Sequence, residues 1–198
     1  MGYTPRLDTQ LGRGIRVPGR TRGSRDCGPR TWRMGIDAVT KGDLRPGIKE
    51  LRKRGSVSGP QQTSIFDAKK AVESYKRPPG RKALKYTIVR KVADVKTAAA
   101  KQRGVHICVH YGEWNKRTSG YTGDPNFQGG HSMLVKGQRY YRGTKQWLVL
   151  DPLEDGRRSN IRQGPTWRNA SAVIAAMERF AGGQGRCYAG VFGGGGKR

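Results

Sequence analysis

The chain has 198 residues, with 40 Lys and Arg against 14 Asp and Glu and a formal net charge of +26. Its length and its hydrophobic fraction of 34% indicate one domain with a modest core. No stretch approaches the roughly 18 apolar residues of a membrane span. The Arg- and Gly-rich start also lacks the apolar region of a secretory signal. These features exclude a membrane-spanning segment, and we expect a cytoplasmic or virion-associated protein without a signal peptide.

The positive charge predicts attraction to an anion, such as nucleic acid, an acidic protein surface or anionic lipid. The basic residues are spread along the whole chain, however, and no helix-turn-helix, zinc-finger or RNA-recognition motif accompanies them. A solvated basic surface and a nucleic-acid-binding module therefore both stay open, the second as the weaker alternative. The three cysteines are widely spaced, which is untypical of a disulfide framework or a zinc ribbon and indicates a reducing compartment.

Composition divides the chain into an arm, a domain and a tail. Residues 1–25 are rich in Gly, Pro and Arg without periodicity, so we expect an extended basic N-terminal arm. Residues 26–192 carry the periodic apolar pattern of a folded domain, and residues 193–198 form a Gly-rich tail. An arm of this kind on a compact domain suggests docking to something anionic in a large assembly.

Within the domain, helical periodicity begins after Asp26, a good N-cap, and Gly42 can end that first helix. The further expected elements, in chain order, are helices over 44–54 and 65–75, a strand over 83–92, a helix over 94–103, a strand over 105–111, a polar loop over 112–129, strands over 131–141 and 146–151 joined by a Gly-containing turn, a helix over 166–180 and a strand over 186–192. Helices followed mainly by antiparallel strands indicate the α+β class.

Some details of these elements follow from single residues. Pro46 belongs in the first turn of its helix, and Asp94 is expected to cap the helix over 94–103. The inner face of the helix over 65–75 should be formed by Phe66, Ala68, Val72 and Tyr75. The helix over 166–180 should bury a stripe of Ala170, Val173, Ile174, Met177 and Phe180 and end at Gly182. The loop over 112–129 is where we expect substrate specificity to lie.

Three residues together indicate nucleophilic chemistry. Cys27 lies at the start of a helix, where the dipole favours the thiolate and the unpaired amides can stabilise an oxyanion. His131 opens a strand directly after two glycines and could accept the thiol proton. Asp151 closes the next strand and could orient the imidazole. We therefore take Cys27, His131 and Asp151 as the candidate catalytic residues.

Each of these residues also has an ordinary explanation when taken alone. A cysteine before a helix is usually a small buried hydrophobe, and an Asp-Pro pair commonly starts a turn. Of the other two cysteines, Cys187 is expected in the core. Cys108 shares one strand face with His106 and His110. That face could hold a metal, but no fourth ligand lies nearby, so we expect neither a metal nor a cofactor.

The segments DCGPRTWRM from Asp26, GGHSMLVKG from Gly129 and WLVLDPL from Trp147 resemble the papain-like cysteine peptidases. The resemblance is closest to the bacteriocin-processing, double-glycine branch and covers roughly residues 24–192. It implies a papain-like α+β fold, with N-terminal helices packed on a mainly antiparallel sheet, and a triad of Cys27, His131 and Asp151.

The chain departs from that family at one position. The family usually has a Gln about six residues before the nucleophile, whose amide helps to form the oxyanion hole, and Thr21 stands there in this chain. Gln10 is too far back for the usual geometry, and loss of one oxyanion donor costs about 10²–10³-fold in turnover. Two functions thus stay open: a papain-like cysteine hydrolase acting on a peptide or amide, and a silent structural component of a large assembly, such as a phage virion, with other protein chains as partners.

Overall fold

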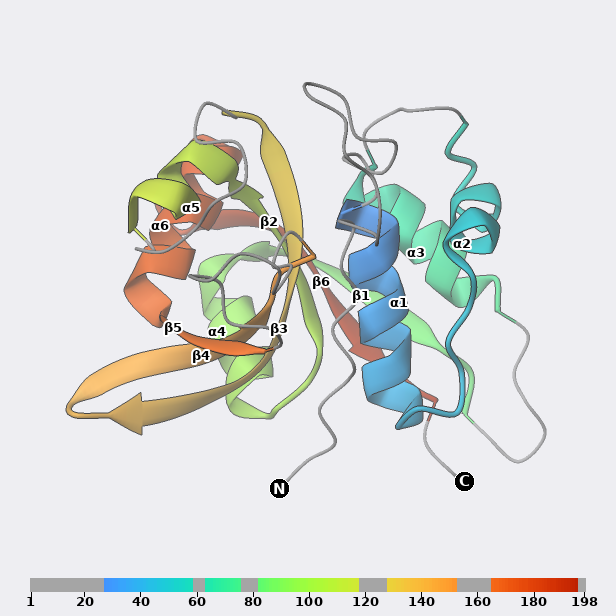
Figure 1. Cartoon of the computed structure of the whole chain (residues 1–198), viewed down its shortest axis with the longest axis horizontal. Helices are drawn as coiled ribbons and strands as arrows, with labels where there is room; N and C mark the ends of the chain where they lie inside the picture. Colours follow the sequence, from blue (N-terminus) through green and yellow to red (C-terminus); the bar gives the residue numbers. More distant parts are fainter. Residues whose placement is uncertain (1–26, 59–62, 76–81, 118–127, 153–164, 196–198) are drawn as a thin grey trace, which may run out of the picture.

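The computed structural model describes residues 27–58, 63–75, 82–117, 128–152 and 165–195. Its strands form one antiparallel sheet (Figure 1). The α+β class is confirmed, with N-terminal helices packed against this sheet. None of the helices in the described ranges is long and apolar enough to cross a membrane.

Three helices come first, followed by strands and helices in mixed order. In chain order they are α1 (Cys27–Thr40), α2 (Ile48–Arg54), α3 (Ile65–Glu73), β1 (Lys85–Lys91), α4 (Val92–Ala100), β2 (Val105–His110), α5 (Tyr111–Arg117), β3 (Gly130–Tyr141), β4 (Thr144–Leu150), β5 (Thr166–Asn169), α6 (Ala170–Ala181) and β6 (Arg186–Gly193). Within the sheet the strands lie in the order β1-β6-β2-β3-β4-β5.

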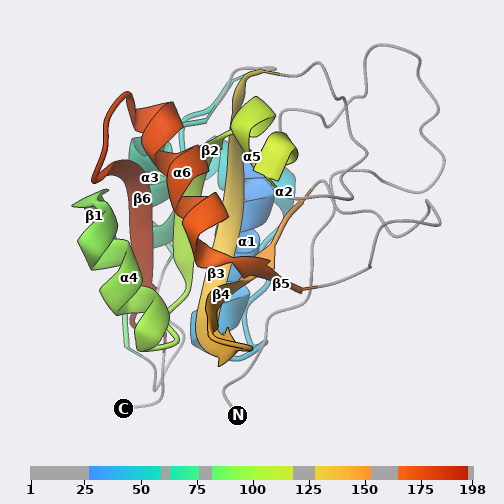
Figure 2. The ribbon, with the colours of Figure 1, turned by 90° about the vertical axis from the view of Figure 1, so that its left-hand side faces the viewer.

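The helices cover both faces of the sheet, and each side has its own apolar core (Figures 1 and 2). Helices α1, α2 and α3 bury one face around Trp32, Ile36 and Leu51. Helices α4, α5 and α6 bury the other. Strand β2 serves both cores by alternation, with Ile107 on the α6 side and Cys108 on the α1 side, as its sequence pattern predicts. The sheet thus lies between two helical layers, with α1, α2 and α3 on one face and α4, α5 and α6 on the other.

Helices α2 and α3 differ from the sequence-based expectation in detail. Helix α2 begins at Ile48 after Gly47, so Pro46 precedes the helix rather than lying in its first turn. Ser64 caps α3 through a capping box with Asp67, which fixes where that helix begins. Phe66, expected on the inner face, is 58% exposed. The actual face is set by Ile65, Ala68, Ala71, Val72 and Tyr75, all buried.

Helices α4 and α6 begin at residues other than those expected. Lys91 occupies the N-cap position of α4, so Asp94 lies inside the first turn, where its charge still suits the helix dipole. The expected helix over 166–180 is a short strand, β5, followed by α6, whose N-cap is Asn169. Backbone pairing of β5 with β4 outweighs the helical pattern of those first residues. Gly182 ends α6 as expected, while Phe180 is 37% exposed.

The turn between β3 and β4 is the Gly-containing turn that the sequence predicts. Arg142 and Gly143 both have positive φ, 48° and 73°, between the paired residues Tyr141 and Thr144. Two consecutive positive φ values are characteristic of a type I′ hairpin turn, which normally selects Asn or Gly. Arg142 is therefore an unusual occupant of this turn.

Other expectations concern residues that are only partly described. The arm over 1–25, Asp26, and residues 196–198 of the tail lie outside the described residues. The polar loop expected over 112–129 is corrected at its start, because α5 occupies Tyr111–Arg117. Residues 118–127 of that loop also lie outside the described ranges.

Candidate active site

Cys27 is the first residue of α1 and lies beside β3. It is half-buried, whereas Cys108 and Cys187 are buried. Burial raises the pKa of the Cys108 thiol to about 12 and that of Cys187 to about 11. Of the three cysteines, Cys27 is the one placed for reaction with a solute.

The next residue, Gly28, lets the start of α1 pack tightly. A Cβ at Gly28 would lie 1.8 Å from Oγ1 of Thr63, the residue before the N-cap of α3. Pro29 follows in the first helical turn, a position that its ring favours. The start of α1 is therefore held against the start of α3, which fixes the position of the Cys27 backbone.

Strands β3 and β4 bring His131 and Asp151 together. Leu134 pairs with Leu150, and Asp151 directly follows β4, so its carboxylate reaches back to the start of β3. Nε2 of His131 and Oδ1 of Asp151 are 2.6 Å apart, and both side chains are almost completely buried. Because Asp151 engages Nε2, Nδ1 is the ring nitrogen left for another partner.

That partner is Cys27, whose thiol interacts with the His131 side chain so that each group favours the charged form of the other. Burial alone would raise the pKa of Cys27, but His131 and the backbone amides of Ser132 and Gly28 outweigh burial and lower it. Burial alone would lower the pKa of His131, yet Asp151 and Cys27 raise it to about 10. Both shifts favour a thiolate–imidazolium pair, which is the reactive form of a cysteine nucleophile.

The structure thus brings together all three candidate residues from three separate elements. Two further contacts hold them in place. Oγ1 of Thr31 donates to the carbonyl of Ser132 at 3.1 Å, which ties α1 to β3. The ring of Tyr111 meets that of His131 edge to face, with centroids 5.3 Å apart. Sequence reasoning did not single out Thr31 or Tyr111; the spacing of Thr31, one turn after Cys27, was the available clue.

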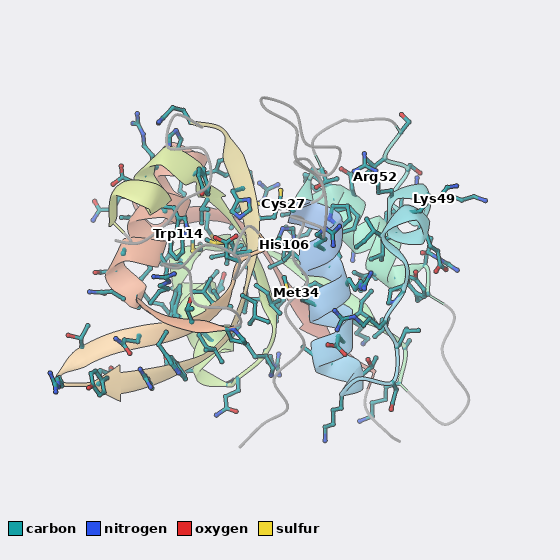
Figure 3. The ribbon with its side chains drawn as sticks, in the orientation of Figure 1. Cys27, Met34, Lys49, Arg52, His106 and Trp114 are labelled. Atoms are coloured by element: carbon teal, nitrogen blue, oxygen red, sulfur yellow. The ribbon has the colours of Figure 1, made fainter. Side chains whose placement is uncertain are left out.

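A second buried polar chain runs beneath the site from β1 to β3. Tyr86 Oη lies 2.7 Å from His106 Nδ1, and His106 Nε2 lies 3.0 Å from Ser132 Oγ. Burial lowers the pKa of His106 to about 3, so this ring is neutral at ordinary pH. In the view of Figure 3, His106 lies below Cys27 near the middle of the molecule. These hydrogen bonds hold the side chain of Ser132, the residue whose backbone contacts both Cys27 and Thr31.

On the strand face considered as a metal site, the candidate ligands are already hydrogen-bonded within the protein. Both ring nitrogens of His106 have partners, and Cys108 Sγ lies 3.8 Å from His106 Nε2. Nδ1 of His110 accepts a hydrogen bond from the backbone of Glu113. Among the residues that the structure describes, no group of three or more His, Cys, Asp or Glu side chains is placed to hold a metal ion. Thr21 and Gln10, the positions relevant to an oxyanion-hole glutamine, lie outside those residues.

Comparison with known structures identifies the fold. The chain is similar to the peptidase domain of Streptococcus ComA, described as a bifunctional ABC transporter involved in a quorum-sensing pathway. The match covers 94% of this chain and 96% of that domain, with a TM-score of 0.50 and 14% sequence identity. This chain has the papain-like cysteine peptidase fold. The fold expected from the resemblance is therefore confirmed, while identity this low leaves activity to be argued from the site.

No protein-family model and no curated protein matches the sequence. The assignment of the fold accordingly rests on the arrangement of the elements.

Proposed function

We propose that this protein is a papain-like cysteine hydrolase that cleaves a peptide or amide bond, with Cys27 as nucleophile, His131 as general base and acid, and Asp151 as the orienting carboxylate. One observation supports this most directly. The buried His131–Asp151 pair faces the one cysteine that is not buried, and both pKa shifts favour the thiolate.

The reaction divides into acylation and deacylation. The Cys27 thiolate attacks the carbonyl carbon, and the negative charge moves to the carbonyl oxygen. As the C–N bond breaks, His131 gives its proton to the leaving amine, so that a thioester and a free amine form. Neutral His131 then takes a proton from water, which attacks the thioester. Cys27 leaves as thiolate, the carboxylic acid is released, and the imidazolium is restored.

The backbone near Cys27 offers donors for the oxyanion. The first amides of a helix have no partner within the helix and point along its axis. In α1 the amide of Gly28 interacts with the sulfur, whereas Pro29, the next residue, has no N–H to donate. In many enzymes, hydrogen-bond donors that point at the oxygen where negative charge develops make the largest single contribution to the rate enhancement. Asp151 contributes by fixing the ring of His131 and by stabilising its protonated form.

Reaction with iodoacetamide tests whether Cys27 is activated. Near neutral pH, peptide mass spectrometry should show rapid modification of Cys27 and slow modification of Cys108 and Cys187. Cys187→Ser is the matched control, and it should keep the fast phase, whereas Cys27→Ser should abolish it. Equal, slow labelling of all three cysteines would sink the proposal.

Cleavage of a peptide library, followed by mass spectrometry, tests hydrolysis itself. Wild type should cleave a subset of peptides, and Cys27→Ala should cleave none while keeping the wild-type melting temperature. The second candidate is a silent structural component of a large assembly with the same fold, which is supported by Thr21 where the family has a glutamine. Thr21→Gln separates the two: hydrolysis seen only in this variant would identify the natural chain as the silent form.

A further inference from the structure

The hairpin of β3 and β4 is positively charged. Together with β5 it contains no Asp or Glu, but it carries Lys136, Arg139, Arg142, Lys145 and Arg168. Figure 1 shows the hairpin extending from the body at the lower left, beyond the helices that cover the sheet. It therefore presents a ribbon of basic side chains to solvent, with no acidic side chain of its own in these three strands.

Aromatic rings and arginines alternate along one face of this ribbon. The Arg139 guanidinium lies 4.4 Å from the Trp167 ring centroid and 5.2 Å from that of Tyr141. The guanidinium of Arg142, a residue of the hairpin turn, lies 5.3 Å from the centroid of the same Tyr141 ring. The row Trp167–Arg139–Tyr141–Arg142, which we call the stacking row, thus runs from β5 across β4 to β3 and ends at the turn.

The stacking row is exposed to solvent. Tyr141 is 48% exposed, Arg139 and Arg142 are exposed, and Trp167 is half-buried. Tyr140, the next residue along the strand, must point to the opposite face, where it meets Lys145 instead. The two faces of the hairpin therefore differ, since only one has a continuous series of rings and cations.

Arg142 occupies a conformation that costs stability. Its φ of 48° is left-handed, which is strained for a residue with a Cβ and less so for the Asn that such turns favour. Residues held in unfavourable backbone conformations are concentrated at functional sites. Because Arg142 lies at the end of the stacking row, we infer that its side chain has a function there and that this function offsets the unfavourable backbone conformation.

We propose that the stacking row binds single-stranded nucleic acid. Arginine and lysine side chains neutralise phosphates, and exposed rings stack with bases regardless of sequence. An acidic peptide would use the cations but leave the rings without a role. A duplex keeps its bases stacked on one another, so that rings on a strand surface gain nothing from it.

This surface is separate from the candidate active site. Tyr141 lies at the opposite end of β3 from His131, about 30 Å away at the usual rise per residue. Variants of the stacking row should therefore leave the rate of Cys27 alkylation unchanged. Failure of the proposed hydrolase activity would not affect this inference, and the reverse also holds.

Fluorescence anisotropy with a labelled oligothymidine strand tests the proposal on the full chain. Tyr141→Ala should weaken binding about 5- to 150-fold, the range for loss of one stacked base, and Tyr141→Phe should retain it. Tyr140→Ala is the matched control, because it removes an adjacent and more exposed tyrosine from the opposite face. It should change affinity little.

The charge contribution is tested by paired substitutions. Arg139→Gln with Arg142→Gln should reduce the dependence of log affinity on log salt by roughly 1.4, about 0.7 for each lost phosphate contact. Lys49→Gln with Lys53→Gln removes the same charge from exposed positions of α2, on the far side of the molecule (Figures 1 and 3). This second pair should leave most of the affinity and the slope intact.

Arg142→Asn is a variant in which weaker binding could not be attributed to unfolding. It should raise the melting temperature, because Asn suits the turn, while it weakens binding. Equal losses from the α2 pair and the hairpin pair, or from Tyr140→Ala and Tyr141→Ala, would assign binding to diffuse charge and overturn the proposal. Tighter binding of the matching duplex, or binding of polyglutamate but not of oligothymidine, would overturn it as well.

Discussion

The hydroxyl of Thr31 and the carbonyl of Ser132 are joined by a buried hydrogen bond of 3.1 Å between segments that are 101 residues apart in the chain. Thr31 lies one helical turn after Cys27, and Ser132 directly follows His131. This single bond therefore fixes the position of α1, which carries the proposed nucleophile Cys27, relative to β3, which carries His131. It is a positioning contact, because neither group touches the reacting atoms.

Thr31→Val tests this contact, since valine has nearly the same shape and no hydroxyl. The buried carbonyl of Ser132 would lose its donor, which costs about 1–3 kcal/mol, and α1 could shift on β3. We expect slower alkylation of Cys27 and a lower rate of hydrolysis, mainly in kcat. Thr31→Ser retains a hydroxyl and should recover most of both rates. If both variants alkylate at the wild-type rate, the contact has no role in positioning.

The rate of Cys27 alkylation should depend on pH in a way set by the ion pair. The pKa of Cys27 is lowered, so the thiolate should persist below the pH at which an ordinary thiol, with a pKa near 9, is protonated. The rate should fall only as the pH drops through that lowered value. The pKa of His131 is raised to about 10, so the imidazolium, and the stability that it contributes, are present at neutral pH and lost as the pH rises through about 10. A rate that rises only near pH 9 would contradict the ion pair.

Asp151→Asn should weaken the same ion pair without removing a large side chain. The carboxylate is the main group that raises the pKa of His131, so the amide should let that pKa fall and the pKa of Cys27 rise. At neutral pH we expect less thiolate and slower alkylation, with the pH profile moved toward higher pH. A mere change in folding would lower the amount of reactive protein but would not move the midpoint of the profile.

His106 gives a further prediction, about stability in acid. Its pKa of about 3 in the folded protein is below the ordinary 6.5, so its contribution to stability is present above pH 6.5 and lost as the pH falls toward 3. His106→Gln retains polar atoms near Tyr86 and Ser132 but does not titrate. Between pH 6.5 and 4 its melting temperature should fall less steeply than that of wild type. Parallel curves for the two proteins would show that His106 is already protonated in the folded state.

The sequence predicts residues and elements that depend on local pattern. Periodicity places α1, β2 and β3, and the chemistry of Cys27, His131 and Asp151 marks them as candidates before their separation in space is known. Burial that depends on distant partners was predicted less well. Phe66 has helical spacing but lies outside, and residues 166–169 pair with β4 instead of extending α6. The chain of Tyr86, His106 and Ser132 joins three strands, and no spacing in the sequence indicates it.

The packing of α1 against α3 at Gly28 affects the position of Cys27. This relation can be tested with a substitution at Gly28 and a second substitution that compensates for it. A Cβ there would lie 1.8 Å from Oγ1 and 3.0 Å from Cβ of Thr63, so Gly28→Ala forces the start of α1 away from α3. Overpacking of this kind costs about 1–3 kcal/mol, and Cys27, the adjacent residue, must move with the backbone. We expect a lower melting temperature and slower alkylation of Cys27. Combining Gly28→Ala with Thr63→Gly removes both contacts and should restore the alkylation rate toward that of Thr63→Gly alone. A double variant as slow as Gly28→Ala would show that the glycine is needed for the backbone of α1 rather than for the space taken by Thr63.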